Sequence, residues 1–165
     1  MRKTTYFRDY KGDGWPDPAW LAPYFLTPSG RRSAFGLTND CWGMNLDGIE
    51  GTEHLPPFNG RIDIHLTILG HPDLGVHLSY QKFAAKGLTF YSEGDLGRLR
   101  ECVETMHGDL VPIGLYVSFE TAWKAIKEFI EMDGALPKNI AWVAGKDLPT
   151  DTFPDPFQGG ARLRD

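Results

Sequence analysis

Residues 61–69, in the middle of the chain, alternate between apolar and polar side chains. Isoleucine or leucine occupies every second position, and Asp63, His65 and Thr67 lie between them. Successive side chains of a β-strand point to opposite faces, so this period of two predicts a strand with one buried face. Such a strand would extend about 30 Å. The rest of the chain must therefore supply a cover for one face of a long strand.

The segments around this strand predict an antiparallel sheet. Residues 75–80 alternate again, and the five-residue connection before them contains Gly70 and Pro72, which favours a hairpin. A third run, residues 88–92, completes a meander over residues 61–92. Shorter strands are expected at residues 4–7, 41–46, 115–117 and 140–143.

Two segments have the period of amphipathic helices. Residues 119–133 carry an apolar stripe, follow a favourable N-cap at Ser118 and stop at Gly134. Residues 96–107 follow Asp95 with apolar side chains at helical spacing. We therefore expect an α+β fold, in which an antiparallel sheet is covered on one face by these two α-helices.

The two ends of the chain are rich in glycine and proline. Residues 18–21 predict one helical turn, residues 24–26 an extended segment, and residues 27–32 a turn. Four aromatic residues of this N-terminal part are expected to pack on the sheet: Trp15, Trp20, Tyr24 and Phe25. Residues 1–145 are predicted to form a single α+β domain, and residues 146–165 an extended or disordered tail rich in proline and glycine.

The charge balance restricts the class of partner. The chain has a net charge of −5, and residues 33–80 alone carry six acidic side chains against one basic. Nucleic-acid phosphates reward positive charge, so we expect no direct nucleic-acid binding, whereas a basic protein is a suitable partner. No 18-residue apolar segment and no signal peptide are recognisable, and Cys41 and Cys102 lack metal-site spacing. These features predict a cytoplasmic protein without membrane contact.

Two sets of polar residues are candidate sites. His65 and His77 lie on the polar faces of neighbouring predicted strands, and a symmetrical hairpin would bring them near Asp63, as in a metal site or an acid–base pair. A small metal-binding protein or enzyme using these three residues is therefore one hypothesis. The other set is Asp47, Glu50 and Glu53, an acidic cluster that would suit a basic partner.

The order of motifs in residues 75–143 matches that of a known family. The segments are Gly75 and Tyr80 at the ends of a short strand, Phe90-Tyr91-Ser92-Glu93-Gly94-Asp95, Val111-Pro112 ahead of another strand, Glu128-Phe129 in the helix, and the closing Gly134, Leu136-Pro137 and Ile140-Ala141-Trp142. This order resembles the immunity proteins of bacterial polymorphic toxin systems, specifically the family numbered first among them. Members of that family usually have a strand where residues 96–107 here predict a helix.

The resemblance implies an antitoxin rather than an enzyme. Such a protein binds a cognate secreted toxin in the cytoplasm and blocks its active site, and the toxins are often nucleases or nucleobase deaminases with a basic substrate groove. It implies no catalytic residue, no metal and no cofactor. An acidic surface that imitates phosphate would occupy the groove, and we expect Asp47, Glu50, Glu53 and Asp63 to bind the toxin.

Overall fold

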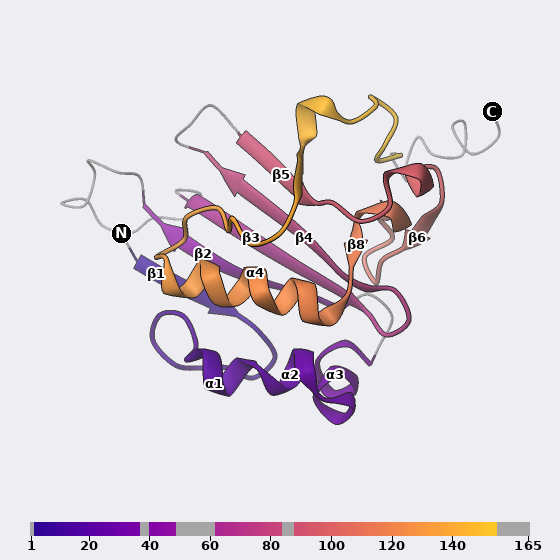
Figure 1. Ribbon diagram of the computed structural model, residues 1–165. Coiled ribbons are helices and arrows are strands. Elements are labelled where there is room, and N and C mark those ends of the chain that lie inside the picture. Colours follow the sequence, from indigo (N-terminus) through magenta and orange to yellow (C-terminus); the bar gives the residue numbers. More distant parts are fainter. Residues whose placement is uncertain (1, 37–39, 49–61, 84–87, 155–165) are drawn as a thin grey trace.

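The computed structural model describes residues 2–36, 40–48, 62–83 and 88–154 (Figure 1). The strands are β1 (Arg2–Tyr6), β2 (Asp40–Asp47), β3 (Ile62–His71), β4 (Gly75–Lys82), β5 (Leu88–Ser92), β6 (Cys102–Glu104), β7 (Leu110–Pro112), β8 (Tyr116–Val117) and β9 (Trp142–Ala144). The α-helices are α1 (Pro18–Leu21), α2 (Pro23–Leu26), α3 (Pro28–Phe35) and α4 (Phe119–Glu131), and short 3₁₀ turns occupy Leu96–Arg98, Ile113–Leu115 and Gly145–Asp147. Within these ranges no helix combines the length and apolar character that crossing a bilayer requires.

One antiparallel sheet organises the described part of the chain. Its strands follow the order β1-β2-β3-β4-β5-β9, β8 pairs with β4, and β6 and β7 form a separate hairpin. The expected α+β class and the meander of β3, β4 and β5 are confirmed. The side chains of Ile64, Leu66 and Ile68 on β3 are almost fully buried, as the alternation of this segment predicts.

Helices cover one face of the sheet. Figure 1 shows α4 lying across the strands, with α1, α2 and α3 beside it. Helix α4 begins at the predicted cap, where Ser118 Oγ accepts from the Thr121 N–H, and the chain reverses after it at Gly134, whose φ is +90°. Its buried side chains meet the sheet and the N-terminal helices in a single core: Phe119, Ala122, Trp123, Ala125, Ile126 and Phe129.

The predicted helix over residues 96–107 is wrong. Only Leu96–Arg98 forms a 3₁₀ turn, and Cys102–Glu104 is the strand β6, which pairs with β7. Asp95 accepts from the Gly97 N–H, which closes a tight turn rather than starting a long helix. Beyond it, Val103 lies opposite Val111, so these residues form a hairpin with the segment that follows five residues later, and not the helix that their apolar spacing predicts.

The second cover of the sheet comes instead from the N-terminal segment. Residues 24–26 are not extended and residues 27–32 are not a simple turn, because α2 and α3 occupy them. Each of α1, α2 and α3 has proline at its first helical position, where a missing N–H costs nothing, and Thr27 Oγ1 caps α3 by accepting from the Gly30 N–H. The expected packing of Trp15, Tyr24 and Phe25 on the core is confirmed.

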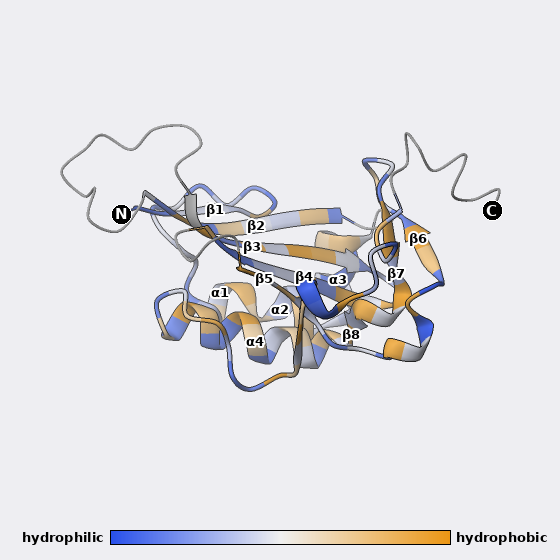
Figure 2. Cartoon of the chain, turned by 90° about the horizontal axis from the view of Figure 1, so that it is seen from above, coloured by the Kyte–Doolittle hydropathy of each residue, from blue (hydrophilic) through white to orange (hydrophobic). Residues whose placement is uncertain are grey.

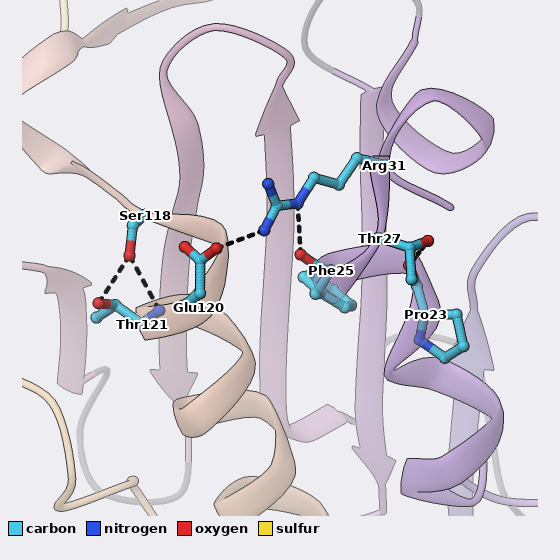
Figure 3. Close-up of polar contacts among 7 residues, drawn as sticks. All are labelled: Pro23, Phe25, Thr27, Arg31, Ser118, Glu120 and Thr121. Atoms are coloured by element: carbon cyan, nitrogen blue, oxygen red, sulfur yellow. Dashed lines mark hydrogen bonds and ion pairs between the residues drawn. The ribbon is translucent and has the colours of Figure 1, made fainter. Parts of the chain in front are cut away.

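Arg31 ties this N-terminal layer to α4. Figure 3 shows its guanidinium between two partners: Nη2 lies 2.6 Å from Glu120 Oε1, and Nε donates to the carbonyl oxygen of Phe25 at 2.5 Å. The guanidinium also lies 4.6 Å from the ring centroid of Phe119. The backbone N–H of Glu120 and the Arg31 guanidinium lower the pKa of the Glu120 carboxyl. The start of α4 is therefore fixed against α2 and α3.

Gly75 is required where β3 turns into β4. Its φ is +100°, and an added Cβ would lie 2.0 Å from the carbonyl oxygen of Val117. Gly108 is a matched control, because its φ is +84° but an added Cβ would meet nothing closer than Glu104 Oε1 at 3.9 Å. We expect Gly108→Ala to lower the free energy of unfolding by about 1 kcal/mol and Gly75→Ala by about 2–3 kcal/mol, since only the latter adds a backbone clash. Urea denaturation measures both, and equal losses would contradict this assignment.

Candidate interaction surface

The face of the sheet opposite the helices carries rows of polar side chains. Figure 2 shows the helices gathered on one side of the sheet, with β6 and β7 at one end of the other side. The strand register places five residues side by side across five strands: Thr4, Asn45, His65, Gln81 and Thr89. A second row, two residues along, consists of Gly43, Thr67, Ser79, Tyr91 and Val143. We call these ten residues the open face.

The side chains of the open face are partly exposed, in contrast to those that alternate with them. Apart from Gly43, every residue of the two rows is in the intermediate range of exposure. Between the rows, on the helix side, Met44, Leu66 and Tyr80 lie side by side and are 1–3% exposed. The same strands thus present a buried, apolar face to the helices. Their other face is partly exposed and carries hydroxyl, amide and imidazole groups.

One end of the open face is acidic. Asp47 ends β2 next to a β-bulge, opposite Ile62 of β3, and its Oδ2 lies 3.7 Å from Nη2 of Arg2. Asp63 follows Ile62 in β3, so the backbones of these two predicted residues meet at one end of the β2–β3 pair. The side chain of Asp63, and the whole of Glu50 and Glu53, lie outside the described residues. The structure therefore brings two of the four predicted toxin-binding residues together.

His65 connects the acidic end to the polar rows. Its Nδ1–H donates to Oδ1 of the neighbouring Asn45. Burial lowers the pKa of His65 from its ordinary value of 6.5, although the Asp47 carboxylate acts in the opposite direction. Burial thus favours the neutral ring, and the described charges at this end of the sheet are those of Asp47 and Arg2.

The proposed pairing of His65 with His77 is wrong. The hairpin register places His65 opposite Gln81 and His77 opposite Leu69, four residues further along β3, which is about 13 Å. The connection between β3 and β4 consists of residues 72–74 rather than the expected five residues, because His71 pairs with Gly75, and this register separates the two rings. Within the described ranges, no group of three His, Cys, Asp or Glu side chains could hold a metal ion. The hypothesis of a site built on His65, His77 and Asp63 loses its geometric basis.

His77 belongs instead to a second, smaller cluster at the other end of the sheet. Its ring stacks on Tyr91 at 5.6 Å between centroids, with Tyr116 at 5.8 Å and Phe153 at 6.4 Å. The ring is 5% exposed, and Nδ1–H donates to the Leu115 carbonyl oxygen at 3.4 Å. Burial lowers its pKa to about 4, so the imidazole is neutral at physiological pH.

Part of the predicted tail helps to close this cluster. Residues 148–154 follow the 3₁₀ turn Gly145–Asp147, and the Phe153 ring lies 4.9 Å from that of Tyr91. Thr152 is 4% exposed, and its Oγ1 donates to the Pro149 carbonyl oxygen at 2.7 Å. These contacts hold the segment against the sheet, and residues 155–165 lie outside the described part of the chain.

Ser92, which belongs to the motif shared with the immunity-protein family, links neighbouring strands through its hydroxyl group. Its Oγ accepts from the Leu78 N–H at 2.9 Å and donates to the Leu115 carbonyl oxygen at 2.7 Å. It therefore joins β4, β5 and the turn before β8 at the point where β8 takes over from β5 as the neighbour of β4.

Sequence patterns did not single out most of the open face. Asn45, Gln81, Thr89 and Tyr91 are ordinary outward positions of alternating strands, and only the register shows that they are neighbours. The alternation itself was the available signal, because it places every second residue of β2 to β5 on the face away from the core. Searches against protein-family models, curated proteins and solved structures found no match for this chain.

Proposed function

We propose that this protein is an immunity protein that binds a cognate secreted bacterial toxin and blocks its active site. The observation that carries the proposal is the end of the β2–β3 pair, where Asp47 lies next to the backbone of Asp63 at one end of the open face. The resemblance of residues 75–143 to toxin-system immunity proteins supports the same conclusion. The strand β6 adds to it, since family members usually have a strand in this region.

The open face can supply most of a protein-binding surface. Five strands spaced about 4.8 Å apart are about 20 Å across, and β3, with ten residues, is about 33 Å long. A standard interface takes about 800 Å² from each partner, more than the roughly 660 Å² that these two lengths give, so segments beside the sheet must contribute to the contact. Hydroxyl, amide and tyrosine side chains give such a surface many hydrogen-bonding groups with little net charge at its centre.

The charge of the chain favours a toxin that handles nucleic acid. A nuclease or a nucleobase deaminase needs a positively charged groove for phosphates, and a protein of net charge −5 with carboxylates at one end of its exposed sheet complements that groove. Attraction between opposite charges also speeds association, which suits an inhibitor that must act before its own cell is damaged.

Charge reversal tests this proposal. The probe is the C-terminal domain of the protein encoded by the gene immediately upstream, carrying an inactivating substitution. Asp47, Glu50, Glu53 and Asp63 are changed to lysine together, and we expect affinity to fall on the order of a hundredfold by titration calorimetry. Circular dichroism confirms that the variant is folded.

A second fourfold variant controls for net charge. Asp13, Asp73, Glu131 and Asp133 are exposed carboxylates outside the open face, and their change to lysine moves the net charge by the same +8, from −5 to +3. We expect this variant to lose less than about tenfold in affinity, through screened long-range attraction only. Equal affinity of the first variant and the unchanged protein would refute the interface.

A further inference from the structure

A third row of side chains, on the same side of the sheet as the open face, is buried. The strand register places Cys41, Leu69 and His77 two residues along from the second row, with Tyr116 of β8 opposite His77. Leu69, His77 and Tyr116 are only 5–6% exposed, although the helices cover the other side of the sheet. Phe153 packs against the cluster that includes Leu69 and Tyr116. The C-terminal part of the chain therefore contributes a cover for this row.

The ring of Phe153 holds this cover against the sheet. We call residues 148–154 the strap. The Phe153 ring lies 4.9 Å from that of Tyr91 and 6.4 Å from that of His77, between centroids. Phe153 is itself partly exposed, whereas His77 is 5% exposed. One aromatic side chain of the strap therefore shields the His77 ring from water.

The hydrogen bonds of the strap are local. The Leu148 N–H donates to the Gly145 carbonyl oxygen at 3.2 Å, and the Thr152 N–H donates to the Pro149 carbonyl oxygen at 3.1 Å. In the part of the chain that the structure describes, no hydrogen bond joins residues 148–154 to a strand of the sheet. These bonds shape the strap without tying it to the sheet.

Other contacts of the strap are weak. Nη1 of Arg100 lies 3.9 Å from Oδ2 of Asp151, and the two side chains are 90% and 62% exposed, so solvent screens this ion pair. Cavities of about 700 and 840 Å³ border the strap, and Pro149, Thr150 and Thr152 line both. Empty space beside a segment deprives it of packing partners, so its local opening breaks few contacts.

We infer that the strap opens as a unit while the sheet stays folded, and that the Phe153 ring is what keeps it closed. The strap pivots on the 3₁₀ turn Gly145–Asp147, because β9, just before this turn, is paired with β5. Segments with few buried contacts open far more often than the whole domain unfolds. Opening uncovers the His77 end of the third row and extends the open face by surface that a partner can then reach. The inference concerns the chain alone and does not depend on the proposed function.

Chemical modification of His77 measures this opening in the unchanged protein. Diethyl pyrocarbonate acylates a neutral imidazole that solvent reaches, and mass spectrometry gives the rate at each histidine. His107 is exposed and serves as the internal reference. At pH 7 we expect His77 to react at least about a hundredfold more slowly than His107, with a rate that changes less than about twofold between 0 and 1 M urea. Hydrogen exchange at the Ile126 amide, in the middle of α4, reports global unfolding and should rise about tenfold or more over the same range.

Phe153→Ala tests the role of the ring, and Phe83→Ala is a control of the same residue type. Phe83 is 50% exposed and lies six residues beyond His77 along β4, which is about 20 Å. We expect Phe153→Ala to raise the modification rate of His77 at least about tenfold and to leave this rate independent of urea. Phe83→Ala should change the rate by less than about twofold.

The outcomes decide the inference in either direction. A His77 rate that rises with urea in parallel with Ile126 exchange would show that the strap opens only when the sheet unfolds. A His77 rate equal to that of His107 would show that the strap does not close, and an unchanged rate in Phe153→Ala would show that the ring does not hold it. Each of these three results refutes the inference, and none of them bears on toxin binding. A slow, urea-independent rate that Phe153→Ala accelerates supports the inference.

Discussion

Replacement of Phe129 by alanine is expected to lower the free energy of unfolding by about 3–5 kcal/mol. The side chain is fully buried in the last turn of α4, where its ring lies 4.7 Å from that of Trp15 and 6.3 Å from that of Tyr80. It thus joins the N-terminal loop, the helix and the sheet. Its removal takes away buried apolar surface and leaves a cavity that the surrounding rings cannot fill without moving.

Urea denaturation followed by circular dichroism measures this loss. Phe83→Ala is the control, since Phe83 is 50% exposed at the end of β4 and its truncation should change stability by less than about 0.5 kcal/mol. A loss below about 1 kcal/mol for Phe129→Ala would show that this position is not part of a well-packed core.

Acidification from pH 7 to pH 4 is expected to lower the stability of the protein by about 3 kcal/mol through His77 alone. Burial lowers the pKa of His77 from 6.5 to about 4 in the folded state. As the pH falls below 6.5, the unfolded chain takes up a proton that the folded chain excludes, so unfolding becomes easier. Above pH 6.5 the neutral His77 ring does not lower the stability of the folded protein. The loss of stability develops as the pH falls from 6.5 to 4.

A variant without the imidazole isolates this effect. His77→Phe keeps a ring beside Tyr91 but cannot titrate, so the stability of the unchanged protein relative to this variant should fall by about 3 kcal/mol between pH 7 and pH 4. His107→Asn removes an exposed histidine instead and serves as the control substitution. Parallel pH profiles for the unchanged protein and His77→Phe would contradict the burial of a neutral ring.

Local patterns in the sequence predicted the elements whose side chains face a single core. The alternation of β3 and β4 and the stripe and cap of α4 each depend on residues close in sequence, and the structure confirms them. Helices α2 and α3 were missed because proline was interpreted as a stop, whereas here it occupies the first helical position. Strand β6 was missed because the helical spacing of Leu96, Leu99 and Val103 was given more weight than a hairpin between residues 102–104 and 110–112.

The candidate site was only partly accessible from sequence. The acidic residues stand out by composition, and the approach of Asp47 to Asp63 follows once β2 and β3 are paired. The rows of the open face and the separation of His65 from His77 depend on register, which a hydrophobic period does not determine. The packing of Phe153 on Tyr91 depends on the path of residues 145–153, where no periodicity exists.

The order of elements along the chain has a consequence for biosynthesis. Strands β1 to β4 are complete at Lys82, yet the largest helix that covers their apolar face ends at Glu131, 49 residues later. At translation rates of about 5–20 residues per second, α4 is synthesised about 2–10 seconds after these strands, and until then it cannot cover their apolar side. The two edge strands, β1 and β9, come from opposite ends of the described chain, so the fold closes only when its last strand has left the ribosome.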